Sequence, residues 1–258
     1  MNMNMTFSDY ISNPSGSARP MMVSQKEMAK QVYTDKYNKM MLRTAGAVQY
    51  ELFKNPNDDK RFTIFFKMPS ESTDKLSYDV VIDFYTKDTV VEQSNSIKNY
   101  FFRVFSNDPN FVFTFAYVFN KNKLIIPELV SKLGKDATSV KPKSTNPNKN
   151  MGYVKALYFA YIFMNDHGLF NKVVWANATK SNTFFHNRLN KVKSFDTKYA
   201  EVQRLKEEQK ENKKPKTHTV IKSEDMFHQK SRVGRVKTVT TINRNRSNHS
   251  VKYVKKIK

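Results

Sequence analysis

Three carboxylates in the middle of the chain come nearest to the residue set of a metal-dependent nuclease. Asp79 and Asp83 lie in an expected strand over residues 78–86, where their spacing puts both on one face, and Glu92 follows nearby. Such an enzyme needs two or three carboxylates, often with a lysine, converging on a divalent ion. No Glu-x-Lys or Asp-x-Lys follows on a neighbouring strand at the expected place. We therefore interpret the aspartates as a solvated strand face and predict no metal site and no catalytic residue.

The other residue types that carry chemistry show no catalytic spacing. The chain has no cysteine, which excludes disulfides, thiolate zinc sites and thiol nucleophiles. Its five histidines form no His-x-His or His-Glu-x-x-His pair, and the Walker A, G-x-G-x-x-G and G-x-S-x-G motifs are all absent. We expect no cofactor and no enzymatic activity.

Charge is the strongest functional signal of the sequence. The chain carries 45 Lys+Arg against 23 Asp+Glu, a net charge of +22. Residues 213–258 hold 14 Lys+Arg against two acids, a net +12, which leaves +10 for the first 212 residues. Lysines and arginines that neutralise phosphates release counterions, which gives salt-sensitive binding without sequence preference. This excess therefore predicts a polyanionic partner, foremost nucleic acid.

The predicted nucleic-acid contacts are cations of this C-terminal segment and of a basic loop over residues 135–150. They are Lys213, Lys214, Lys216, Arg232, Arg235, Lys237, Arg244, Arg246, Lys252, Lys255 and Lys256 in the segment, with Lys141 and Lys143 in the loop. Val233, Val236, Val239 and Ile242 alternate with polar residues, which would also permit extended pairing on a protein partner. A solvated tail and a solvated loop are the alternatives.

These residues must be positioned by a folded core, which we place in the aromatic stretch 78–126. Alternation predicts strands over residues 48–54, 61–68, 78–86, 99–105, 111–119 and 124–126. Residues 106–110 have the composition of a hairpin loop. Both faces of 111–119 are apolar, so we expect a central strand with Val112, Phe113 and Phe115 buried. The fold class predicted is α+β: an antiparallel sheet of about five or six strands packed by helices, with a basic extended C-terminal tail.

Helical spacing of apolar residues predicts helices over 24–42, 127–133 and 151–166, whereas 169–175 and 184–192 are ambiguous. The helix over 24–42 belongs to a methionine-rich stretch that could form an adaptable contact surface or simply core; its methionines are Met21, Met22, Met28, Met40 and Met41. We divide the chain into an N-terminal arm (1–23), an α+β core domain (24–195), a charged helix (196–212) and the basic tail (213–258). The arm would dock on a neighbouring subunit or fray.

The same sequence contains no apolar run of the roughly 18 residues that a membrane span requires. The first 20 residues lack the apolar region of a secretory signal. We therefore predict no membrane span, and action in a reducing cytoplasm or inside a particle assembled there.

Several short phrases occur together between residues 6 and 170. They are Asn13-Pro14-x-Gly16, Pro69-Ser70-Glu71-Ser72 before Tyr78-Asp79-Val80-Val81-Ile82, Phe105-Ser106-Asn107-x-Pro109-x-Phe111-Val112-Phe113, Pro142-Lys143-x-x-Asn146-Pro147 and Leu157-Tyr158-Phe159-Ala160. This pattern resembles poorly characterised proteins of phages that infect low-GC Gram-positive bacteria, which are usually regarded as virion structural or assembly components. The resemblance implies a role in a phage particle or its assembly, and no transferable active site.

The leading hypothesis is thus a virion-associated structural or assembly protein of the connector, neck or inner-particle type. Its partners would be other virion subunits and non-specifically bound nucleic acid, and it would occur in the virion and, during assembly, in the host cytoplasm. Two alternatives are a free nucleic-acid-binding protein of phage replication or regulation, and a protein-priming terminal protein whose hydroxyl accepts the first nucleotide.

Overall fold

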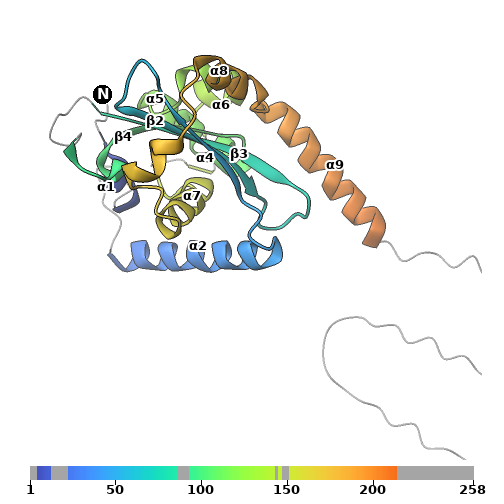
Figure 1. The fold of residues 1–258 in the computed structure, drawn as a ribbon. Coiled ribbons are helices and arrows are strands. Elements are labelled where there is room, and N and C mark those ends of the chain that lie inside the picture. Colours follow the sequence, from blue (N-terminus) through green and yellow to red (C-terminus); the bar gives the residue numbers. More distant parts are fainter. Residues whose placement is uncertain (1–4, 13–22, 87–92, 143–144, 147–150, 214–258) are drawn as a thin grey trace, which may run out of the picture. The chain divides into compact units, whose positions relative to one another are not determined.

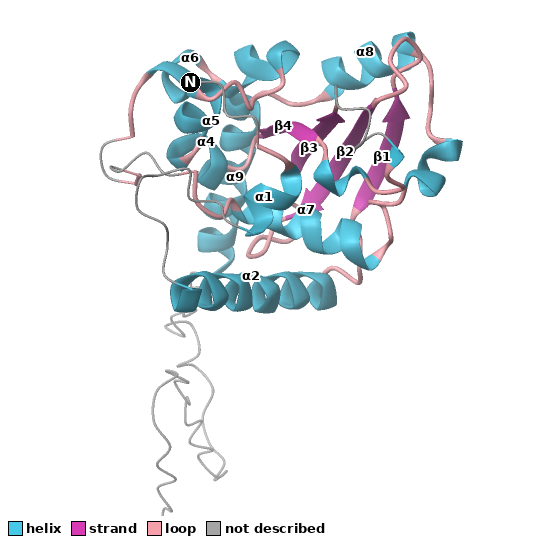
Figure 2. Ribbon diagram, turned by 90° about the vertical axis from the view of Figure 1, so that its left-hand side faces the viewer, coloured by secondary structure: helices cyan, strands magenta, loops and turns pink. Residues whose placement is uncertain are grey.

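A computed structural model describes residues 5–12, 23–86, 93–142, 145–146 and 151–213 (Figure 1). The chain divides after Lys214 into two units, and all described residues belong to the first. This unit is an α+β fold in which helices surround one antiparallel sheet (Figure 2). The predicted fold class is confirmed at this level.

The sheet has four strands in the order β1-β2-β3-β4, each antiparallel to its neighbour. The strands are β1 (Gln49–Lys54), β2 (Arg61–Pro69), β3 (Ser77–Tyr85) and β4 (Phe101–Ser106). Ile64 on β2 pairs with Ile82 on β3, which pairs in turn with Val104 on β4, and all three are fully buried. The strand alternation that predicted these four elements is confirmed, but the described residues form four strands rather than five or six.

Residues 111–119, expected to form a central strand, lie in two short helices instead, and the first of these begins within the expected hairpin loop 106–110. The helices are α4 (Pro109–Thr114) and α5 (Ala116–Lys121). The Asp108 side chain caps α4 by accepting a hydrogen bond from the Asn110 N–H at 2.8 Å, and Pro109 occupies the first turn. A run that is apolar on every side fits a buried helix as well as a buried strand, so the apolar pattern does not distinguish the two. The helix start signal Asp108-Pro109 indicates the helix.

The burial predicted for that strand is accordingly wrong in part. Val112 is buried, but Phe113 is 50% exposed and Phe115 is only partly buried. The last expected strand, 124–126, contributes a single parallel bridge between Ile125 and Val104.

Both outer edges of the sheet are partly occupied by other parts of the chain. Bridges from Thr6 and Ile125 lie along β4, and Thr179 bridges to Phe53 of β1. Unpaired strand edges are templates for aggregation, and short segments that occupy them block such pairing. The same contacts bring residues that are distant in sequence to the sheet rim.

Helices cover both faces of the sheet. The adjacent residues Phe65 and Phe66 of β2 point to opposite sides: Phe65 packs against Phe185 of α8 (Asn182–Lys191), and Phe66 against Phe163 of α7 (Lys155–Asp166). The long helix α2 (Val23–Arg43) packs on α7, so that α7 lies between it and the sheet (Figures 1 and 2).

The described part of the N-terminal arm belongs to this core. Phe7, Tyr10 and Ile11 of α1 (Phe7–Ser12) are buried, and the Phe7 ring lies edge-on to Phe84 and Phe102. The Tyr10 hydroxyl accepts a hydrogen bond from the Val154 N–H at 3.0 Å. Docking on a neighbour and fraying are therefore both wrong for residues 7–12, while residues 13–22 lie outside the described part.

The remaining helical elements are short, apart from the last. They are η1 (Ile97–Asn99), η2 (Pro127–Leu133), α6 (Lys135–Ser139), η3 (Lys172–Asn177) and α9 (Phe195–Lys213). η2 confirms the helix predicted over 127–133, and α9 confirms the charged helix. The two ambiguous stretches form η3 and α8, so neither is a strand.

Candidate nucleic-acid interface

The structure describes only two of the residues predicted to contact nucleic acid. Lys141 is exposed, and Lys213 is the last residue of α9. The others lie outside the described residues: Lys143, Lys214, Lys216, Arg232, Arg235, Lys237, Arg244, Arg246, Lys252, Lys255 and Lys256. Lys141 lines a cavity of about 460 Å³ together with the apolar side chains of Phe113, Val140 and Phe195. This lining is mainly apolar, so it is not a strongly basic surface.

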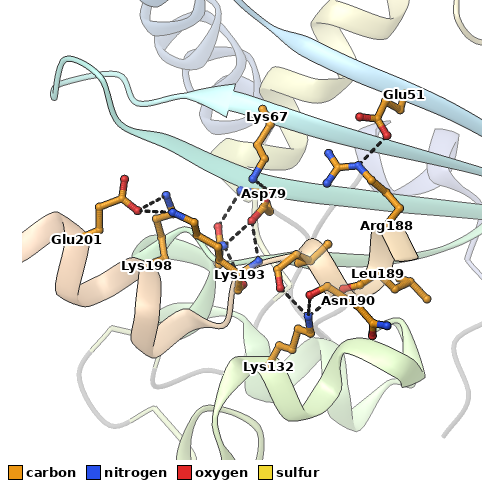
Figure 3. A network of polar contacts seen from close by, with 12 residues as sticks. Glu51, Lys67, Asp79, Lys132, Arg188, Leu189, Asn190, Lys193, Lys198 and Glu201 are labelled. Carbon is orange, nitrogen blue, oxygen red and sulfur yellow. Dashed lines mark hydrogen bonds and ion pairs between the residues drawn. The ribbon is translucent and has the colours of Figure 1, made fainter. Parts of the chain in front are cut away.

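The junction between α8 and α9 is held by a buried carboxylate. Asp79 on β3 is only 2% exposed. It forms an ion pair with Lys67 and accepts hydrogen bonds from the Lys193 N–H at 3.0 Å and the Asn107 side-chain amide at 3.1 Å (Figure 3). A solvated face was therefore the wrong interpretation: the linker between α8 and α9 covers this part of the sheet.

Lys132 supports the same junction from η2. Its Nζ donates hydrogen bonds to the carbonyl oxygens of Leu189, Asn190 and Val192 at 2.8, 3.0 and 2.6 Å (Figure 3). These carbonyls lie at the C-terminal end of α8, where the helix leaves oxygens without internal partners and favours positive charge. Burial lowers the pKa of Lys132 from its usual value, although Asp79 opposes the shift.

The first turns of α9 are fixed by a lysine pair on one glutamate. Lys198 is 3% exposed, and its Nζ lies 2.7 Å from a Glu201 carboxylate oxygen, which also receives Lys193 Nζ at 3.1 Å. Burial acts to raise the pKa of Glu201, but the hydrogen bonds from both lysines outweigh it and leave the pKa below its usual value. These contacts order the linker and the first turns of α9, and the bond from the Lys193 N–H to Asp79 joins this end of the helix to the sheet.

The second aspartate of the presumed nuclease set is also structural. Asp83 is 1% exposed and receives Arg61 Nε at 3.0 Å and the Thr63 hydroxyl at 2.8 Å, both from β2. Burial raises the pKa of Asp83, and the Arg61 and Thr63 bonds oppose that rise. Glu92 lies outside the described residues. Within the described residues, no three His, Asp or Glu side chains are grouped so that they could hold a metal ion.

A lysine-lined pocket is the basic feature that sequence reasoning missed. Lys54, Lys172 and Lys180 surround a cavity of about 340 Å³, with Asp59 as the carboxylate among its lining residues. Ala176 and three buried aromatic side chains form the rest of its wall; the aromatic residues are Phe62, Tyr100 and Trp175. Ammonium groups gathered in this way suit a phosphate, which lysine binds as a point charge.

The two lysines nearest these rings are held by them. Lys54 Nζ lies 5.5 Å from the centre of the Phe62 ring and Lys172 Nζ lies 5.1 Å from that of Tyr100, both within cation–π range. The three lysines come from β1, η3 and the loop before α8, which meet through the Phe53–Thr179 bridge. No sequence spacing indicates that pairing, so the pocket could not have been predicted.

None of the described helices combines the length and the apolar character needed to cross a membrane. No family model matches the sequence, and no curated protein and no solved structure matches it either.

Proposed function

We propose that the protein is a virion-associated structural or assembly component of a phage, of the connector, neck or inner-particle type, which holds nucleic acid through its basic C-terminal segment. The observation that carries the proposal is the distribution of charge: residues 213–258 supply +12 of the total +22. The partners are other virion subunits and nucleic acid bound without sequence preference. The protein acts in the virion and, during assembly, in the host cytoplasm.

The folded body supports this proposal by the way it uses its carboxylates. Asp79 and Asp83 both hold the sheet and its neighbours together through buried bonds. Removing either would disturb packing, which makes a structural role the simpler account of both. The bonds around Asp79 and Glu201 fix the base of α9, from which the basic segment continues in sequence.

The lysine-lined pocket gives the body a second contact of the same kind. Lys54 and Lys180 can reach a phosphate at its mouth, whereas Lys121 on α5 and Lys191 on α8 are exposed and do not line the pocket. We expect Lys54→Gln with Lys180→Gln to weaken binding of single- and double-stranded DNA by the body, and Lys121→Gln with Lys191→Gln to weaken it less. Equal effects of the two pairs, measured by fluorescence anisotropy on residues 1–214, would remove the pocket from the interface.

Mass spectrometry of purified virions tests the proposed location most directly. A stoichiometric amount of the protein in the particle supports the structural role. Its absence from virions together with DNA binding in solution would instead indicate a free protein of replication or regulation. Covalent attachment to the ends of the genome would indicate a terminal protein.

A further inference from the structure

Helix α2 presents a narrow exposed stripe of apolar residues on the side that faces away from the body. Met28, Val32 and Leu42 are 69%, 49% and 84% exposed, whereas Tyr37 and Met40 on the other side are buried. Two exposed charged residues, Asp35 and Lys39, lie between the apolar ones on the same stripe. Single exposed apolar side chains are ordinary on protein surfaces, but these three share a line.

The spacing of the stripe is that of a helix-pairing seam. Residues 28, 32, 35, 39 and 42 follow one another at alternating intervals of four and three. This is the repeat of the a and d positions of a heptad, the positions through which one helix packs against another. α2 has its own body on one side and this seam on the other.

We propose that the seam binds the same seam of a second copy of this chain, with the two α2 helices antiparallel. In an antiparallel pair each a position faces a d position of the partner. Because the two chains run in opposite directions, the residue numbers of any two facing residues add up to the same value. With that sum at 74, Val32 faces the partner's Leu42 and Asp35 faces the partner's Lys39. Two-fold symmetry repeats each contact, which gives two apolar pairs and two ion pairs.

Other arrangements of the same two helices are unfavourable. Parallel pairing in register would put Asp35 against Asp35 and Lys39 against Lys39, and like charges opposed in this way repel. An antiparallel pair displaced by one heptad would put Val32 opposite Asp35 and Met28 opposite Lys39. Of these three arrangements, only the antiparallel register in which Val32 faces the partner's Leu42 pairs apolar residues with apolar residues and acidic residues with basic ones. Met28 then lies beside the turn that follows the partner's α2, at Gly46, which has no side chain in the way.

The size of the contact predicts its strength. In this register the helices overlap over residues 31–43, a length of about 20 Å at about 1.5 Å per residue. Two helices in contact over this length bury less surface than the roughly 1,200 Å² that stable interfaces bury. We therefore infer weak association of the free protein, which becomes effective where many copies are held together, as in a particle. The inference does not depend on nucleic-acid binding.

Charge exchange on the full chain tests the register. Asp35→Lys replaces two ion pairs by two repulsive pairs, as does Lys39→Asp, and each should weaken self-association at least about tenfold. The double variant restores opposite charges and should associate to within about threefold of the unchanged protein. Sedimentation over a concentration series measures all four proteins. Val173→Glu, at a residue 71% exposed on η3, is the matched control and should change nothing.

Cross-linking gives a second readout, because the chain has no cysteine of its own. A mixture of the Val32→Cys and Leu42→Cys proteins should form a mixed disulfide dimer upon mild oxidation, while either protein alone should form little. A protein that stays monomeric at every concentration, a double charge variant without rescue, or equal cross-linking of all pairings would each overturn the proposal. A monomeric protein whose seam is inaccessible to solvent would also overturn the proposal, because another part of the same chain would then cover the seam.

Discussion

The folded body and the basic C-terminal segment carry nearly the same net charge and use it differently. The first 212 residues hold +10 and residues 213–258 hold +12. In the body, several buried or partly buried cations are committed: Lys198 to Glu201, Arg61 to Asp83, and Lys132 to three carbonyl oxygens. The segment has 14 cations and only two acids, so 12 of its positive charges are in excess over its acidic side chains.

This difference separates charge that builds the fold from charge that is available to a partner. A buried ion is tolerated only when its bonds compensate for the water it loses, so removing one partner destabilises the fold. Cations in excess along a polar segment are compensated by counterions, which a polyanion displaces. Substitutions of the buried charges in the body should therefore change stability and leave binding, and substitutions in the segment should do the reverse.

The largest effect expected in the body is that of Asp79→Ala. The change leaves the Lys193 N–H, the Asn107 amide and the Lys67 ammonium without their shared acceptor. We expect the free energy of unfolding to fall by about 2–4 kcal/mol, measured by urea denaturation. Glu207→Ala, on an exposed position of α9, is the control and should change it by less than about 0.5 kcal/mol. An Asp79→Ala protein as stable as this control would show that the buried network is dispensable.

A smaller effect is expected for Lys132→Met, which keeps the apolar stem and removes the ammonium. Three carbonyl oxygens at the end of α8 lose their donor, and we expect a loss of about 1–3 kcal/mol. Lys135→Met, on the exposed side of α6, should be nearly neutral. DNA binding at a temperature where the variant is folded should not change; a clear loss would place Lys132 at the interface instead.

At neutral pH the smallest effect on stability is expected for the buried tyrosines, because they ionise only at alkaline pH. Burial raises the pKa of Tyr37, Tyr78 and Tyr153 to about 12. Because the folded protein favours the neutral phenol, its contribution to stability is full below about pH 10 and is lost as pH rises towards about 12. Absorbance titration of tyrosinate should show this late ionisation, and Tyr37→Phe should remove part of it. Ionisation of every tyrosine near pH 10 in the folded protein would contradict the burial.

The fold could be predicted from sequence where local signals agree with the final structure. In β2 and β3, alternation and β-branched residues point to the strands that form. In residues 109–121 the two signals conflict, because dense aromatics favour a strand while Asp108 and Pro109 start a helix. Phe111 is buried and Phe113 is half exposed. In a strand these two residues would share one face, whereas in a helix they point in different directions.

For the nucleic-acid interface, the sequence predicts which segment is rich in cations but not how the residues are arranged in space. Net charge shows which segment is basic, but not that Lys54 and Lys180 share one pocket, since this follows from the β1 bridge to Thr179. The aspartates on β3 were misjudged for the same reason. Whether a polar strand residue faces water depends on what covers the sheet, and Asp79 is covered by a linker more than a hundred residues away in sequence.

The central claim is that the C-terminal segment is the main nucleic-acid element. It is tested by DNA binding of the full chain and of residues 1–214 over a series of salt concentrations, with urea unfolding of both as a control. We expect deletion to remove most of the binding, to leave unfolding nearly unchanged, and to reduce strongly a log–log salt slope of magnitude about 6–10. Equal affinity and equal slope for the two proteins would contradict the claim and assign the charge of the segment to a protein neighbour.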